Sequence, residues 1–231
     1  MKRLHLSKRL MAVAEYIEHG SRVADIGTDH GYLPVWLIQN NVCDYVIAAD
    51  IGEGPLNQAK RFAAEYLAEE RITFVLTDGL SGIQAELIDT IVLAGMGGET
   101  IINILNAFVP HAGEHKLIVQ PQSKIGELTI WLYNAGYKIA KQRLVRERGN
   151  IYTVMKVSAG ASEKPDDAEM YISRTLYESG DPLLAGYIDL NISKLTRALA
   201  GVSKAGRDKE KKAHLNAAVR GLNKMKEGLI K

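Results

Sequence analysis

The sequence predicts an α/β fold, in which a doubly wound, mostly parallel sheet of the Rossmann-like type precedes a C-terminal α-helical, antiparallel coiled-coil hairpin. Three observations predict it. Short apolar runs typical of buried strands alternate with amphipathic helical segments over the first part of the chain. Several runs end in glycine or aspartate, and beyond residue 188 the apolar spacing changes to steps of three and four. We place a boundary in the polar segment Ser158–Pro165 and expect domains over residues 1–160 and 161–231.

Composition excludes several classes of protein. The chain has 231 residues, 46% hydrophobic and 24% charged, as expected of a soluble globular protein. No run approaches the roughly 18 apolar residues of a membrane span, and the N-terminus lacks the apolar core of a secretory signal. Cys43 is the single cysteine, so an intrachain disulfide is excluded and we expect Cys43 to pack beside a strand. We predict a cytoplasmic protein with neither a membrane partner nor a metal site.

The first predicted helix spans Leu6–Glu18. Ser7 is a suitable N-cap, and apolar residues recur behind it at helical spacing. Lys8 and Arg9 lie on the first turn. They are either ordinary solvent-facing charges or cations that guide a phosphate toward the neighbouring cofactor site.

The segment Arg22–Leu33 is the centre of the predicted sheet domain. Its apolar start predicts a strand covered on both faces, and Gly27 and Gly31 bracket a tight turn into the next helix. A strand, a glycine turn and a helix N-terminus form the nucleotide-binding corner of a doubly wound sheet. Asp25 lies in the strand and Asp29 inside the turn, so this corner is acidic.

The acidic turn indicates which nucleotide binds. A dinucleotide site has the spacing G-x-G-x-x-G, which leaves bare amides for a pyrophosphate, whereas this turn is G-x-x-x-G with Asp29 inside it. A carboxylate repels phosphate and attracts a cation. S-adenosylmethionine carries an ammonium and a sulfonium and no phosphate, so it fits this turn. The alternative interpretation is an ordinary strand-to-helix turn in which Asp29 caps the helix.

Two more acids follow predicted strands. The strand at 45–49 ends on Asp50, 19 residues after Gly31, close to the offset of about 20 at which an acid binds ribose hydroxyls; alternatively, Asp50 caps the helix predicted at 54–69. The strand at 72–76 precedes Asp78, whose carboxylate can accept a hydrogen bond from the amine of an adenine. Because ligands bind beyond the carboxyl ends of parallel strands, we expect the acids at these three successive strand ends to meet in one donor site. Their neighbours are assigned to the same site: His30, Ile51, Gly79, Leu80 and Gly95.

The fourth and fifth strands, predicted at 89–94 and 116–119, lead to a site for a flat target base. The fourth runs into a glycine-rich segment that permits close approach of the backbone, namely Gly95, Met96, Gly97 and Gly98. The fifth is followed by Gln120, whose amide can pair with a base edge, and by Pro121, which stiffens the turn. The alternatives are a plain turn after the fourth strand and a solvated amide after the fifth. A helix at 123–135 and strands at 137–146 and 151–157, joined at Gly149-Asn150, complete the domain.

The C-terminal segment combines two heptad seams with a strong positive charge. Residues 194–231 hold eleven Lys and Arg against three acids, a net charge of +8, which leaves −6 for the rest of the chain. We expect two antiparallel helices joined at 203–208, with the seams as packing surfaces. The seams are Ile188, Ile192, Leu195, Leu199 and Val202, then Leu215, Ala218, Leu222, Met225 and Leu229. Cations outside the seams can meet phosphates, and the candidates are Lys194, Arg197, Lys204, Arg207, Lys211 and Lys212. The alternative is a solvated face.

The motifs VADIGTDHGYLP, AADIGEGPL, TDGL, LAGMGGE and IVQPQ, followed by the helical tail, resemble the bacterial tRNA (adenine(22)-N1)-methyltransferases, the TrmK family. The resemblance covers nearly the whole chain. It implies a class I methyltransferase domain, S-adenosylmethionine as donor and tRNA as substrate. It also implies that Asp50, Asp78 and the turn bearing Asp25, Gly27, Asp29 and Gly31 hold the donor, and that residues 95–98 receive the base. Tyr32, beside this turn, is assigned to the substrate.

The chemistry of such a substrate needs no strong base. N1 of adenine is unprotonated near neutral pH, and its lone pair can attack a sulfonium methyl directly. The product base is cationic, so a nearby carboxylate stabilises the transition state. Our hypothesis is that Asp29 supplies this field and later accepts a proton from the base, with His30 as a rival acid or base.

Two other functions stay open at this point. The first is a methyltransferase that acts on a small molecule or protein and uses the hairpin to dimerise. We expect a monomer instead. Activity that does not depend on salt would favour this first alternative. The second is a nicotinamide-dependent oxidoreductase, which Asp29 disfavours. A non-enzymatic RNA-binding protein is disfavoured, because it would not need three acids around a donor site.

Overall fold

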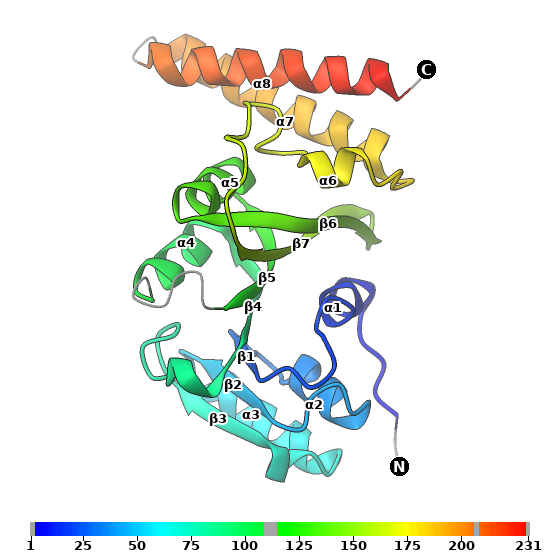
Figure 1. The fold of residues 1–231 in the computed structure, drawn as a ribbon, viewed down its shortest axis with the longest axis vertical. Helices are drawn as coiled ribbons and strands as arrows, with labels where there is room; N and C mark the ends of the chain where they lie inside the picture. Colours follow the sequence, from blue (N-terminus) through cyan, green and yellow to red (C-terminus); the bar gives the residue numbers. More distant parts are fainter. Residues whose placement is uncertain (1–2, 109–114, 206–207, 230–231) are drawn as a thin grey trace.

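A seven-stranded sheet with helices on both faces forms the larger part of the fold, and a group of helices follows it (Figure 1). The computed structural model describes residues 3–108, 115–205 and 208–229. Its strands are β1 (Val23–Ile26), β2 (Val46–Asp50), β3 (Ile72–Leu76), β4 (Thr90–Gly97), β5 (Lys116–Ser123), β6 (Tyr137–Glu147) and β7 (Asn150–Ala159). Its α-helices are α1 (Lys8–Ala14), α2 (Tyr32–Gln39), α3 (Glu53–Glu65), α4 (Gly98–Asn106), α5 (Ile125–Asn134), α6 (Arg174–Tyr177), α7 (Leu184–Ala205) and α8 (Lys209–Gly228).

The strand order is β3-β2-β1-β4-β5-β7-β6. Strands β1 to β5 are parallel, and β7 is antiparallel to both of its neighbours. β1 therefore pairs with β2 on one side and with β4 on the other, which is the point where the order of the sheet reverses. In an open α/β sheet the ligand crevice lies at this point, beyond the carboxyl ends of the strands. The predicted fold class is confirmed.

Alternate residues of the strands face two separate cores. One core joins the sheet to α1, α2 and α3 and includes Val23, Val46 and Val92. The other joins it to α4 and α5 and includes Ala24 and Leu93. Because both faces are covered, the parallel strands are apolar along their length instead of alternating. Cys43 is buried in the first core, as predicted, and burial raises the pKa of its thiol to about 12.

The helices after residue 160 pack on the outer hairpin of the sheet, at the top of Figure 1. Leu144 of β6 lies in one apolar cluster with Ile188 of α7 and Leu222 of α8. The backbone N–H of Leu144 also donates to Asp181 at 3.0 Å, and Gln142 accepts from the Ser173 N–H at 3.1 Å. The C-terminal helices are thus attached to the sheet by an apolar core and by buried hydrogen bonds.

The two predicted seams meet each other inside the chain. Leu195 of α7 and Leu215 and Ala218 of α8 are buried in this cluster, with the remaining α7 seam residues and Met225 packed beside them. Leu229 is an exception, because α8 ends at Gly228 and the side chain is 40% exposed. The two predicted C-terminal helices are confirmed and pack against each other; the antiparallel coiled-coil hairpin and the division into domains at residue 160 stay predictions.

Several predicted ends were wrong. α1 ends at Ala14 and not at residue 18, because Tyr16 and Ile17 turn more tightly and donate three residues back. α3 ends at Glu65 because Leu67 adopts a left-handed conformation, with φ 55°. α7 continues to Ala205, into the predicted loop.

The hairpin turn also lies one residue earlier than predicted. Glu147 pairs with Asn150, so the two turn residues are Arg148 and Gly149, with φ of 48° and 82°. Two positive φ angles in a two-residue loop are typical of a type I′ turn.

No helix in the described ranges is long and apolar enough to cross a membrane.

Candidate functional site

The loop after β1 bends through three left-handed residues. Gly27, Asp29 and Gly31 have φ of 71°, 53° and 73°. Gly27 and Gly31 are also close-packed, since a Cβ on Gly31 would lie 3.0 Å from Cβ of Ala59 and one on Gly27 would collide with Met96. Gly31 is the N-cap of α2, so the loop delivers the chain directly into that helix. The predicted strand, glycine turn and helix are confirmed.

Asp50 ties the end of β2 to this loop. Its carboxylate accepts from the backbone N–H of Asp29 at 3.1 Å and from that of Gly52 at 2.8 Å. The Asp29 carboxylate is 69% exposed and lies 3.6 Å from Nε2 of His30. The end of β2 and the loop therefore present two carboxylates at one edge of the sheet, and backbone hydrogen bonds hold that of Asp50 in place.

Asp25 lies beneath the loop, only 5% exposed. Burial, and to a smaller extent the negative charge of Asp50, raise the pKa of its carboxyl to about 7. The Thr28 hydroxyl makes no hydrogen bond of standard geometry, yet it lies near enough to lower this pKa in part. Asp25 is therefore a titratable group near neutral pH.

Asp78 follows β3 and is exposed in the loop that continues the same edge. Ile51 is 71% exposed beside Asp50, so it offers an apolar surface at this edge. Leu80 is only 2% exposed and belongs to the second core. Its side chain therefore cannot contact a ligand, and only its backbone and that of Gly79 remain candidates.

The structure of the glycine-rich segment 95–98 differs from the prediction. Gly95, Met96 and Gly97 are not a turn but an extension of β4, with an irregular register against β5. Gly95 has φ 83°. Gly98 is buried, and a Cβ there would lie 2.6 Å from the carbonyl oxygen of Lys124. Gly98 therefore packs α4 against the end of β5. Because it is buried there, it is not available to contact the base.

Gln120 and Pro121 are also placed differently. Both belong to β5 and are buried, and the Gln120 side chain is 0% exposed. Its Oε1 accepts a hydrogen bond from Nη1 of Arg9 at 2.6 Å. The predicted pairing of Gln120 with a base edge is wrong, because this amide is already committed to the arginine.

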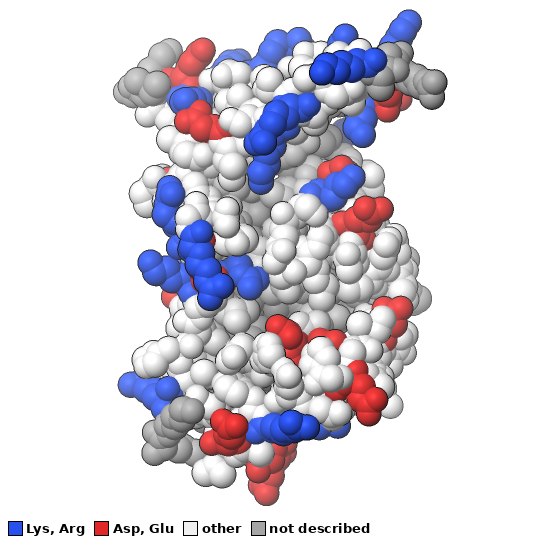
Figure 2. Space-filling view, turned by 180° about the vertical axis from the view of Figure 1, so that it is seen from behind, with Lys and Arg blue, Asp and Glu red and all other residues white. Residues whose placement is uncertain are grey.

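Basic side chains cover the C-terminal helices. Figure 2 shows Lys and Arg across the top of the molecule, over α7 and α8, and a second group at mid-height. The predicted cations that the structure describes are all exposed: Lys194, Arg197, Lys204, Lys211 and Lys212. Arg207 lies outside the described residues. Figure 2 also shows acidic side chains in the lower half of this face, with some lysines and arginines among them.

The geometry agrees with comparisons to known proteins. Residues 6–155 match the model of a methyltransferase domain family. The chain is 38% identical over 161 residues to the tRNA (adenine(22)-N(1))-methyltransferase of Bacillus subtilis, which is 69% of this chain and 68% of that protein. The chain belongs to the TrmK family.

Two solved structures show how far this likeness extends. The crystal structure of B. subtilis TrmK aligns with a TM-score of 0.82 at 30% identity, over 97% of this chain and 98% of that one. A Streptococcus pneumoniae protein, solved in complex with S-adenosyl-L-methionine, aligns with a TM-score of 0.83 at 26% identity, over 96% and 100%. The likeness to these TrmK-type structures therefore includes the C-terminal helices.

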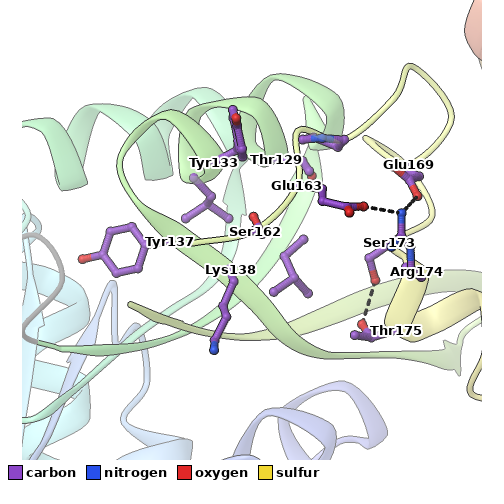
Figure 3. A pocket seen from close by; sticks show the side chains of 13 residues that line it. Thr129, Tyr133, Tyr137, Lys138, Ser162, Glu163, Glu169, Ser173, Arg174 and Thr175 are labelled. Carbon is purple, nitrogen blue, oxygen red and sulfur yellow. Dashed lines mark hydrogen bonds and ion pairs between the residues drawn. The ribbon is translucent and has the colours of Figure 1, made fainter. Parts of the chain in front are cut away.

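One pocket lies away from this edge of the sheet. Figure 3 shows it between α5, β6 and the segment after β7, with Tyr137 and Lys138 on one side and an ion pair of Arg174 with Glu163 on the other. It has a volume of about 250 Å³. None of the predicted site residues lines it, so it is separate from the candidate donor site.

Two residues near the site, and one contact of Met96, could not be predicted from the sequence. Met96 was assigned to the base, but its packing on Gly27 was not foreseen. Glu147 and Tyr152, from β6 and β7, both lie beside Arg9. No sequence pattern marks them, because their position follows from where the hairpin lies beside α1. Among the described residues, no cluster of three metal-ligating side chains occurs.

Proposed function

We propose that this chain transfers a methyl group from S-adenosylmethionine to N1 of an adenine, at position 22 of tRNA. Membership of the TrmK family and the gathering of Asp29, Asp50 and Asp78 at one edge of the sheet support this function. S-adenosylmethionine supplies an electrophilic methyl group on a sulfonium and carries no phosphate. The acidic loop suits it, because the carboxylates attract its cationic centres.

The donor site follows from the fixed groups of this edge. The Asp50 carboxylate is held by two backbone N–H groups and retains acceptor capacity for ribose hydroxyls. Exposed Ile51 offers an apolar surface to a purine face. Asp78 would accept from the adenine amine, and the left-handed Gly27 brings the backbone close to the ligand.

The target adenine would enter beside Gly95 and Met96. An adenine inside folded tRNA is stacked and must be exposed before its N1 can react. N1 then attacks with its own lone pair, so the protein needs to orient the base and stabilise the positive charge that develops. Asp29, exposed at the same edge, is the carboxylate assigned to that field, and Tyr32, 40% exposed, lies beside it.

The exposed cations of α7 and α8 would hold the body of the tRNA through its phosphates. We also infer that the chain acts in the cytoplasm as a monomer. The seams of α7 and α8 are buried against each other, which leaves them unavailable for a dimer. Light scattering should therefore give the mass of a single chain.

The deciding experiment is incubation with labelled donor and unmodified tRNA, followed by nucleoside analysis. We expect label in 1-methyladenosine, and no label when the tRNA carries guanosine at position 22. The Asp50→Ala variant should bind donor weakly and give little product. Label in another nucleoside, or none with tRNA, would refute the proposed function.

A further inference from the structure

Arg9 places a guanidinium at the edge of the candidate base site. A Cβ on Gly95 would lie 3.2 Å from its Nη1, so the guanidinium lies directly against the glycine where the base would enter. The Arg9 side chain is 23% exposed and remains accessible from solvent. It comes from α1, which packs against the hairpin of β6 and β7.

Gln120 fixes the guanidinium from below. Its Oε1 accepts from Nη1 of Arg9 at 2.6 Å, and its Nε2 donates to the carbonyl of Pro121 at 3.1 Å. The second bond determines which end of the amide faces the arginine. Because Gln120 is 0% exposed, this interaction is protected from competition with water.

Glu147 and Tyr152 hold Arg9 from the hairpin. The Glu147 carboxylate accepts from the backbone N–H of Arg9 at 2.9 Å, and its other oxygen lies 3.9 Å from Nε. Cζ of Arg9 lies 5.7 Å from the centre of the Tyr152 ring, within the range of a cation–π contact. Four segments of the chain thus converge on one side chain.

The contacts made by the described residues leave most N–H donors of the Arg9 guanidinium free. A guanidinium has five N–H donors, of which Gln120 takes one, while the 3.9 Å separation from Glu147 is too long for a hydrogen bond. A fixed planar fork with free donors suits bidentate binding of phosphate. The reacting base becomes cationic and would be repelled, so among the groups of an RNA substrate the phosphate is the match.

We propose that Arg9 binds a phosphate adjoining the target adenosine and that Gln120 is the residue that positions Arg9. The proposal rests on the proposed function and adds to it a contact for the reacting nucleotide itself, separate from the cations of α7 and α8. It also explains Gly95, because a larger side chain there would displace the fork.

The first test is steady-state methylation of tRNA by Arg9→Ala, Arg9→Lys and Gln120→Met. We expect Arg9→Ala to lower kcat/KM for tRNA by about 10- to 100-fold, with donor affinity by calorimetry unchanged. Arg9→Lys should restore little, since it keeps the charge and loses the fork. Arg61→Ala removes an exposed arginine of α3 and is the matched control, which should keep wild-type kinetics.

The second test identifies the phosphate. We compare tRNA that carries a neutral methylphosphonate on either side of the target adenosine with ordinary tRNA. The wild type should have a lower kcat/KM for the methylphosphonate tRNA, whereas Arg9→Ala should have the same kcat/KM for both. Losses that multiply would overturn the proposal, as would full activity of Arg9→Ala. The Arg9→Ala/Gln120→Met double variant should be no worse than Arg9→Ala alone. If Gln120→Met does not fold, the methylphosphonate cycle alone decides. Wild-type enzyme that leaves the adenine of unmodified tRNA unmethylated would instead refute the proposed function.

Discussion

The terminal methyl group of Met96 occupies the space that a Cβ on Gly27 would need. The extension of β4 and the loop after β1 are therefore in direct contact, at the point where the sheet order reverses. A donor held by the loop and a base received beside Met96 would share one wall. Changes on one side of this contact should be felt on the other.

Gly27→Ala should disrupt this contact and weaken donor binding. The substitution adds the cost of a left-handed alanine, roughly 1–2 kcal/mol, to the displacement of Met96. Gly20→Ala is the matched control, because Gly20 also has a left-handed φ, 79°, but has open space around it. Urea unfolding should show a larger loss in the free energy of unfolding for Gly27→Ala than for Gly20→Ala. Adding Met96→Ala to Gly27→Ala should restore part of that loss. Equal losses at Gly20 and Gly27 would contradict a role for Met96.

Asp25 should make the stability of the ligand-free protein fall as pH rises from about 4 to about 7. Over this range the carboxyl is ionised in the unfolded chain but stays protonated in the folded one, where its pKa is about 7, so the folded state binds the extra proton. The full contribution is present below pH 4, and about 4 kcal/mol of it is lost by pH 7. Urea titrations of wild type and Asp25→Asn at several pH values should diverge accordingly. Parallel curves would show that Asp25 does not titrate in this way.

Asp29→Asn should slow methyl transfer more than it weakens donor binding. Asparagine tolerates the left-handed backbone at this position, φ 53°, so the variant removes the charge and keeps the loop. Because the carboxylate is 69% exposed, solvent screens its field, and we expect about a tenfold loss in the single-turnover rate. His30→Gln tests the rival acid or base. An unchanged rate for Asp29→Asn with a reduced rate for His30→Gln would transfer the role to the histidine.

Neutralising Lys211 and Lys212 should weaken tRNA binding and its dependence on salt. Both are exposed on α8, and removing each lysine–phosphate interaction should reduce the slope of log affinity against log salt by roughly one. Lys60→Gln/Arg61→Gln removes an adjacent exposed pair from α3 and should leave the slope unchanged. Filter binding between low and moderate salt measures both variants. Equal slopes for the two would place the tRNA elsewhere.

Much of the fold could be predicted from local patterns. Buried parallel strands are continuous apolar runs, so β2 and β3 were identified within a residue of their ends. The extension of β4 through Gly97 and of β5 through Ser123 could not be predicted, because Gly97 pairs with Ser123 and nothing in either segment alone indicates that pairing. The helix ends at Ala14 and Glu65 could not be predicted either. The residues that follow each end are also common in helices, so the sequence pattern continues past the turn that ends the helix.

The placement of Asp29, Asp50 and Asp78 at one edge of the sheet could be predicted, because each lies at or just after the end of a strand and parallel strands bring these ends together. The surroundings of Arg9 could not be. Gln120 and Glu147 lie 111 and 138 residues from Arg9 in the sequence, and only the packing of α1 on the hairpin brings them together. The sequence therefore suggested that the Gln120 amide binds a base, whereas in the structure it binds Arg9.

The burial of Cys43 has a practical consequence. Its pKa of about 12 and its place in the core make the chain's single native thiol inert to maleimide reagents at neutral pH. A cysteine introduced on the outer surface of α8 would then react alone, without a cysteine-free background. With a second dye on an RNA, fluorescence energy transfer would then follow the distance between α8 and the RNA in real time.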